Sequence, residues 1–190
     1  AFAHVGQRFD AWIDAFDTTD KDATELFRRL DPDMGNANRA WEHLVSTADF
    51  DAVAAMNRTY LNYFNVLGQY RRGVDVCTQA VERLRTHGAP TELLCTVQLA
   101  GAAMAREGGD LTTAAAMCVE ACDVATEHGH DELAARARQY LGDAKQMSGD
   151  YDAAAALYAE ASAAFEQHGN LAETANTLNS LASLETMQER

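Results

Sequence analysis

The sequence has few of the residues that interrupt regular secondary structure, with two prolines and twelve glycines in 190 residues. A β-rich fold needs many turns built on these residues, so their scarcity disfavours it. Aromatic residues are also few, at 8%, although hydrophobic residues reach 47%, enough for one globular domain with a continuous core. Alanine-rich stretches such as 153–156 favour closely packed helices. The composition therefore predicts an all-α protein.

Basic residues are scarce as well: 15 Lys and Arg stand against 29 Asp and Glu, for a formal net charge of −14. Such a chain repels a phosphate backbone, so we expect no direct binding to nucleic acid. The excess of acid is uneven, because residues 1–106 carry a net −3 and residues 107–190 a net −11. We expect a solvated acidic surface there, with a docking site for a basic partner as the alternative.

Long hydrophobic runs are missing, since no stretch approaches the roughly 18 uninterrupted apolar residues of a membrane span. The first ten residues also lack the charged start and apolar run of a secretory signal. We therefore expect a cytoplasmic protein with no membrane partner. The chain begins with Ala1 rather than Met, which suggests a piece of a longer protein.

The sequence also lacks the motifs of catalytic, cofactor and metal sites. It has no nucleophile elbow, no HExxH, no phosphate-binding GxxxxGK[ST] and no CxxC among its four cysteines. Cys118 and Cys122 share a helix face but have no second ligand pair, and Asp110 and Asp150 fall where carboxylates cap helices. We expect buried, reduced thiols, no enzyme activity, no cofactor and no metal.

What the sequence does contain is a repeat of about 40 residues. Gly68, Gly109 and Gly149 each end an amphipathic run, at separations of 41 and 40 residues. A second series follows each of them by 20 residues, and its members are His87-Gly88, His128-Gly129 and His168-Gly169. We expect each glycine to end a helix at positive φ, and each histidine to bond the last free carbonyls of its helix.

These markers divide the chain into helices of nearly constant length. They are predicted at 50–67, 71–87, 91–107, 111–128, 131–147, 151–168 and 171–187. Small residues recur where paired helices must approach closely, and these are Gly73, Ala80, Ala114, Ala121, Ala154 and Ala161. The pattern predicts a right-handed α-solenoid of antiparallel helical hairpins.

The third repeat resembles the tetratricopeptide consensus. The residues that carry the resemblance are Leu141, Gly142, Gly149, Asp150, Tyr151, Ala154, Tyr158 and Ala161. The leading Trp and closing Pro of that consensus are missing, and the first two repeats match it less well. The longer period is similar to the variety of this repeat found in bacterial regulators.

A second resemblance concerns the segment before the repeats. Residues 38–42, NRAWE, and 48–50, ADF, resemble the opening of the sensor arms of bacterial STAND-class regulators. In that family a nucleotide-binding ATPase precedes the repeats, so the resemblance implies that the ATPase lies outside this chain. We expect residues 36–190 to form one continuous repeat domain and residues 1–35, with their apolar clusters, to form a helical cap.

The resemblance also implies a concave groove lined by the first helix of each hairpin, where a protein or peptide partner binds. The positions transferred from the family are Arg58, Asn62, Asn65, Thr96, Leu99, Ala103, Arg106, Arg136, Gln139, Asp143, Gln146, Asn176, Asn179 and Ser183. This set is rich in amides and carries three arginines, which suits a peptide backbone and a carboxylate or phosphate. The family's clamp for C-terminal carboxylates is not reproduced, because Ala100 stands where a polar contact belongs.

Three functions remain open from the sequence. The first is a protein- or peptide-binding sensor arm of a larger bacterial signalling or transcriptional regulator. The second is a receptor whose groove closes around a small effector molecule. The third is an oligomerisation scaffold that stacks through terminal helix faces around Leu178, Leu181 and Leu184. A solvated inner face without a ligand is the plain alternative to the groove.

Overall fold

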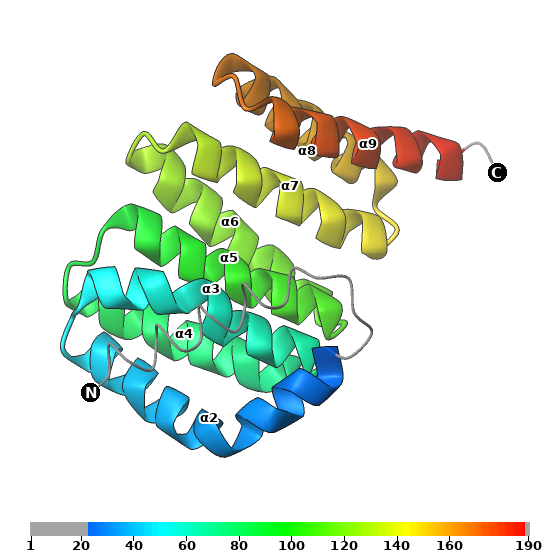
Figure 1. Ribbon diagram of the computed structural model, residues 1–190. Coiled ribbons are helices and arrows are strands. Elements are labelled where there is room, and N and C mark those ends of the chain that lie inside the picture. Colours follow the sequence, from blue (N-terminus) through cyan, green and yellow to red (C-terminus); the bar gives the residue numbers. More distant parts are fainter. Residues whose placement is uncertain (1–22, 189–190) are drawn as a thin grey trace.

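The computed structural model describes residues 23–188, which form eight α-helices and no strands (Figure 1). The helices are α2 (Ala23–Ser46), α3 (Phe50–Val66), α4 (Tyr70–Thr86), α5 (Thr91–Glu107), α6 (Leu111–Glu127), α7 (Asp131–Met147), α8 (Tyr151–Gln167) and α9 (Leu171–Gln188). Each helix packs on the next in sequence, so the chain forms an all-α solenoid of helical hairpins. The predicted fold class is confirmed.

The seven helices expected from the sequence are all present, and each end lies within one residue of its predicted position. The helix α2 precedes them and runs continuously through Pro32 and across the boundary placed between residues 35 and 36. Figure 1 shows this helix bent, as a proline within a helix favours. Most of the expected N-terminal cap lies outside the described residues, so that division of the chain stays a prediction.

The regular helix lengths come from a repeated C-terminal cap. All six predicted glycines adopt positive φ, between 65° and 83°. At the end of α3, for example, the Gln69 N–H donates to the Phe64 carbonyl at 2.8 Å, closing the turn around Gly68. Such caps satisfy carbonyls that the helix leaves free, and they reverse the chain within three residues. A glycine every 20 residues therefore sets the period of the solenoid.

The small residues pack where the pattern placed them, because all six predicted small positions at helix contacts are buried. Gly142 of α7 gives the clearest case: a Cβ atom there would lie 2.7 Å from the ring of Tyr158 on α8. Tyr158 itself is fully buried. Close approach of α7 and α8 thus depends on a residue without a side chain.

The cap histidines agree with the sequence in position, and one agrees in bonding. His87, His128 and His168 each follow the last residue of a helix. The His128 Nδ1 atom lies 2.9 Å from the Val124 carbonyl oxygen, as expected. His168 instead points to the first helix of its own hairpin, with Nε2 3.4 Å from Asp131 Oδ2.

The four cysteines are free thiols, three of them buried and Cys122 half-buried. Burial raises the pKa of Cys77 and raises the pKa of Cys118 to about 12. Both thiols are therefore protonated at neutral pH and belong to the core.

No helix within residues 23–188 combines the length and the apolar character that crossing a bilayer requires.

Candidate functional site

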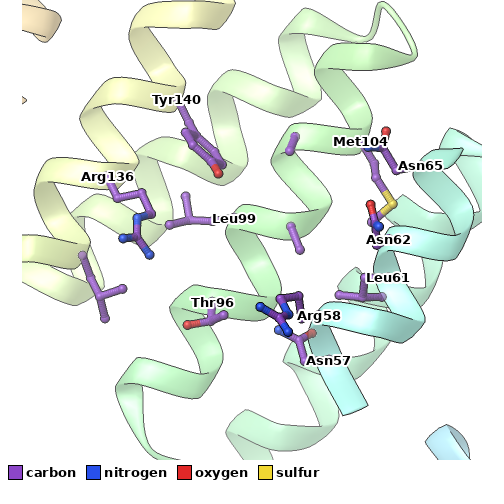
Figure 2. Close-up of a pocket in the computed structure, with 13 residues that line it drawn as sticks. Asn57, Arg58, Leu61, Asn62, Asn65, Thr96, Leu99, Met104, Arg136 and Tyr140 are labelled. Atoms are coloured by element: carbon purple, nitrogen blue, oxygen red, sulfur yellow. The ribbon is translucent and has the colours of Figure 1, made fainter. Parts of the chain in front are cut away.

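The first helices of three successive hairpins lie side by side, because α3 contacts α5 and α5 contacts α7. Between them is a cavity of about 440 Å³ (Figure 2). It is lined by Asn57, Arg58, Leu61, Asn62, Asn65, Thr96, Leu99, Ala100, Ala103, Met104, Leu133, Arg136 and Tyr140. Its size falls in the range of roughly 300–1,000 Å³ that is usual for ligand sites.

Helical periodicity explains how these side chains meet. On α5, Thr96, Leu99 and Ala103 are spaced three and four residues apart, so they share one face of the helix. The residues of α7, at 133, 136 and 140, follow the same spacing. The opposite face of each helix packs on the second helices of the hairpins, which leaves these rows facing the cavity.

The floor of the cavity is apolar. Leu99 lies at its centre on α5, with Leu61 of α3 toward one wall and Tyr140 of α7 toward the other (Figure 2). Burial raises the pKa of the Tyr140 hydroxyl above its usual value, more than the nearby arginines lower it. Tyr140 is therefore neutral at physiological pH and contributes an aromatic surface with one hydroxyl group.

The polar groups of the cavity are cationic or neutral, and no carboxylate is among its lining residues. Arg58 is exposed, and no acidic group within the described part of the chain forms an ion pair with it. Arg136 Nη2 lies 3.4 Å from Glu173 Oε1, and its side chain is 40% exposed. The cavity thus presents two arginines in a chain whose net charge is −14.

Asn57 is the most unusual polar residue of the lining. It is 5% exposed, and its side-chain Oδ1 atom has no hydrogen-bond partner within the described part of the chain. A buried acceptor without a donor is costly, by about 1–3 kcal/mol, and is rare in folded proteins. Asn57 lines the cavity, but its Oδ1 atom is enclosed by the cavity wall, so a ligand can satisfy this atom only once the side chain turns toward the cavity.

Seven of the fourteen predicted site residues line this cavity, and they are Arg58, Asn62, Asn65, Thr96, Leu99, Ala103 and Arg136. Three others, Asn176, Asn179 and Ser183, lie exposed on α9, outside it. Gln139 is half-buried on α7 and is not part of the lining either.

The remaining three predicted residues, Arg106, Asp143 and Gln146, form a polar cluster beside the cavity, where the Arg106 guanidinium lies 5.9 Å from the ring centre of Tyr140. Arg106 of α5 donates to the Asp143 carboxylate of α7 and to Glu107 at 2.8 Å. The Tyr158 hydroxyl of α8 donates to Asp143 Oδ1 at 2.8 Å and lies 2.8 Å from Gln146 Oε1. Arg106 thus connects two neighbouring units and adjoins the cavity through Tyr140, without being one of its lining residues.

The pKa values of this cluster follow from burial and pairing. Burial raises the pKa of Asp143, and this outweighs the hydrogen bond from Tyr158 and the charge of Arg106, which lower it. Burial lowers the pKa of Arg106, but the bond to Glu107 and the charge of Asp143 raise it further than burial lowers it. The cluster is an interhelical ion pair supported by a tyrosine.

Five lining residues were missed by the sequence analysis: Asn57, Leu61, Met104, Leu133 and Tyr140. Ala100 had been named there only as the residue that breaks the clamp. Most are apolar, and the positions carried over from the repeat family favoured polar groups. Leu61 and Tyr140 follow from helical spacing, since each lies three or four residues from a predicted site residue. The burial of Asn57 has no signal in the sequence.

Two other sequence expectations concern metals and terminal faces. Within residues 23–188, no three His, Cys, Asp or Glu side chains form a group suited to a metal ion. At the C-terminal end, Leu178 is 49% exposed, but Leu184 is fully buried against Ala154 and Tyr158 of α8. Leu184 therefore does not contribute to the open face on which it was placed.

Comparison with known proteins gives a structural relative and no family. No protein-family model matches the sequence, and no curated protein matches it. Among solved structures, the chain is similar to BtubC (BKLC) from P. vanneervenii, with a TM-score of 0.70 and 18% sequence identity. The similarity covers 89% of this chain and 68% of that one. At this identity it shows a shared all-helical fold and nothing about function.

Proposed function

We propose that this chain is a non-catalytic, protein- or peptide-binding module of the tetratricopeptide type, which holds its partner in the cavity formed by α3, α5 and α7. The observation that carries the proposal is the lining of that cavity, with two arginines and no carboxylate around an apolar floor in a strongly acidic chain. A large apolar surface with a few convergent polar groups is the usual composition of a binding site.

The proposal extends to the biological setting. The segment that resembles the opening of STAND sensor arms, at residues 38–50, supports a role as the sensor or regulatory arm of a larger bacterial signalling or transcriptional regulator, in the cytoplasm. In such an arm, binding at the cavity is the input to the regulator. Solenoids suit this role because each unit adds binding surface without changing its neighbours.

Filling the cavity tests the proposal. Ala103 is half-buried in the lining, so Ala103→Trp places a bulky ring in the space that a partner needs. The matched control is Ala116→Trp, at an exposed position on α6, outside the cavity. The probe is an array of random-sequence peptides of about twelve residues, and circular dichroism checks that both variants stay folded.

We expect the parent protein to bind a subset of the array, Ala103→Trp to lose that subset and Ala116→Trp to retain it. Peptide binding that is equally strong in all three proteins would contradict the assignment of the cavity. A parent protein that binds no peptide would contradict the proposed function itself.

The small-molecule receptor stays the second candidate, because the cavity volume of about 440 Å³ also suits a metabolite. A thermal-shift screen of metabolites distinguishes the small-molecule receptor from the peptide-binding module. Stabilisation of the parent protein and not of Ala103→Trp, without any binding to the peptide array, would favour the receptor.

A further inference from the structure

The charges of the cavity are arranged across it rather than gathered at one place. Arg58 comes from α3, Arg136 comes from α7, and Leu99 of α5 lies between them (Figure 2). A ligand that crosses all three helices therefore meets a positive charge, an apolar surface and a second positive charge. A ligand that fits must therefore carry its negative and apolar groups in the matching order.

Both arginines are available to an incoming carboxylate. Arg58 has no ion-pair partner within the described residues. The contact of Arg136 with Glu173 is long, at 3.4 Å, and both side chains are more than a quarter exposed. Exposed pairs of this kind contribute little to stability, so a ligand carboxylate can replace Glu173 at small cost.

Asn57 adds a requirement that a simple anion cannot meet. Its Oδ1 atom has no donor among the described residues and is enclosed by the cavity wall, so a ligand reaches it once the side chain turns toward the cavity. That ligand must supply a donor, which neither a carboxylate nor a fully ionised phosphate provides. A peptide unit carries both an N–H donor and a carbonyl acceptor, so it satisfies Asn57 in either orientation of the side-chain amide. The cavity therefore favours a polypeptide segment over a free anion.

The width of the cavity sets the length of that segment. Neighbouring packed helices lie about 8–10 Å apart, so the axes of α3 and α7 are separated by roughly 16–20 Å. An extended chain covers about 3.3 Å per residue, which means that it crosses this distance in about five or six residues.

We infer that the cavity binds an extended peptide segment with an acidic side chain at each end and a large apolar side chain between them. One carboxylate pairs with Arg58 and the other with Arg136, the apolar side chain packs on Leu99, and a backbone amide bonds the Asn57 side chain as that side chain turns toward the cavity. This inference rests on the proposed function and names the partner sequence that the site selects.

Synthetic hexapeptides test it. One acetylated and amidated library has Glu at both ends, Leu at the third position and the other positions varied, and a matched library has Gln in place of both Glu residues. The affinities of the best members are measured by calorimetry for the parent protein and for Arg58→Gln/Arg136→Gln. The control is Arg71→Gln/Arg83→Gln, which removes the same charge from exposed positions on α4, outside this cavity.

We expect the Glu peptides to bind the parent protein about tenfold more tightly than their Gln counterparts, as two partly exposed ion pairs imply. Arg58→Gln/Arg136→Gln should remove this preference, and Arg71→Gln/Arg83→Gln should retain it. Asn57→Leu should weaken both libraries by a similar factor of about five, because it removes a contact to the backbone.

Equal affinity for the two libraries, with binding still blocked by Ala103→Trp, would overturn the inference and leave the proposed function in place. The same conclusion follows if neither library binds while longer peptides on the random array still do. If hexapeptides bind and Ala103→Trp does not weaken that binding, both the inference and the proposed function are overturned.

Discussion

At the scale of single residues, Asn57 shows a conflict between stability and binding. Its buried Oδ1 atom, which has no partner among residues 23–188, destabilises the folded chain by about 1–3 kcal/mol relative to a satisfied group. Leucine has a similar shape and no polar atom, so Asn57→Leu should raise the free energy of unfolding by about 1 kcal/mol while weakening peptide binding. Urea denaturation measures the first effect. A less stable Asn57→Leu would mean that the amide is satisfied in the free protein.

Gly142 gives a second prediction at this scale, because a methyl group there would meet the Tyr158 ring at 2.7 Å. The ring cannot easily move aside, since it is fully buried and its hydroxyl is bonded to Asp143. Gly142→Ala should therefore lower the free energy of unfolding by about 1–3 kcal/mol. The control is Gly35→Ala in α2, where a Cβ atom meets nothing within 4 Å.

Alanine is the better helix former, so Gly35→Ala should raise the free energy of unfolding by about 0.5–1 kcal/mol. Thermal or urea denaturation of the two variants gives the comparison. If both substitutions changed stability in the same direction, the close packing of α7 on α8 would not be what requires glycine at position 142.

At the scale of elements, the ion pair between Arg106 and Asp143 joins α5 to α7. Arg106→Gln leaves the Asp143 carboxylate at a largely buried position without a cation. We expect a loss of roughly 1–2 kcal/mol in the free energy of unfolding at about pH 7. The loss should shrink as the pH falls, because a protonated Asp143 needs no cation.

The sign follows from the pKa of Asp143, which burial raises above its ordinary value of 3.8 and which Arg106 lowers in part. Removing Arg106 raises this pKa further. The folded variant then binds the proton more readily than the unfolded chain, so its stability falls as the pH rises through the folded pKa. Urea midpoints between about pH 7 and about pH 5 measure this difference. Arg106→Gln/Asp143→Asn is the control, and a deficit independent of pH would contradict the argument.

The elements also show what the sequence could predict. The helix bounds were predictable because each cap glycine is a local signal that acts within its own turn. The role of Arg106 was not, because Asp143 is 37 residues away and its second partner, Tyr158, lies on another helix. Helical periodicity gave the side of α3 and α5 that faces the cavity, but nothing in the sequence of α9 shows that the cavity ends before it.

At the scale of the whole molecule, the core is unevenly distributed along the solenoid. One continuous cluster of buried side chains extends from α2 to α7 and includes Trp41, Tyr60 and Leu84. The hairpin of α8 and α9 is held by two small clusters, one of which contains Tyr158 and Leu184. The first residue of α9, Leu171, is 75% exposed. A terminal helix packs against a neighbour on one side alone, so it gives up less packing when it opens. We therefore expect α9 to open before the other helices.

Hydrogen exchange tests this order of opening, with backbone amides of α9 expected to exchange faster than those of α4 and α5. Two leucines, both fully buried, provide a matched pair of variants. Leu184→Ala removes about 2–5 kcal/mol of packing from the terminal hairpin and should accelerate exchange in α8 and α9 alone. Leu84→Ala removes a similar amount from the main cluster, so it should accelerate exchange from α2 to α7 as well. If Leu184→Ala accelerated exchange equally in every helix, the solenoid would unfold as one cooperative unit, and binding at α3, α5 and α7 would be coupled to the order of α9.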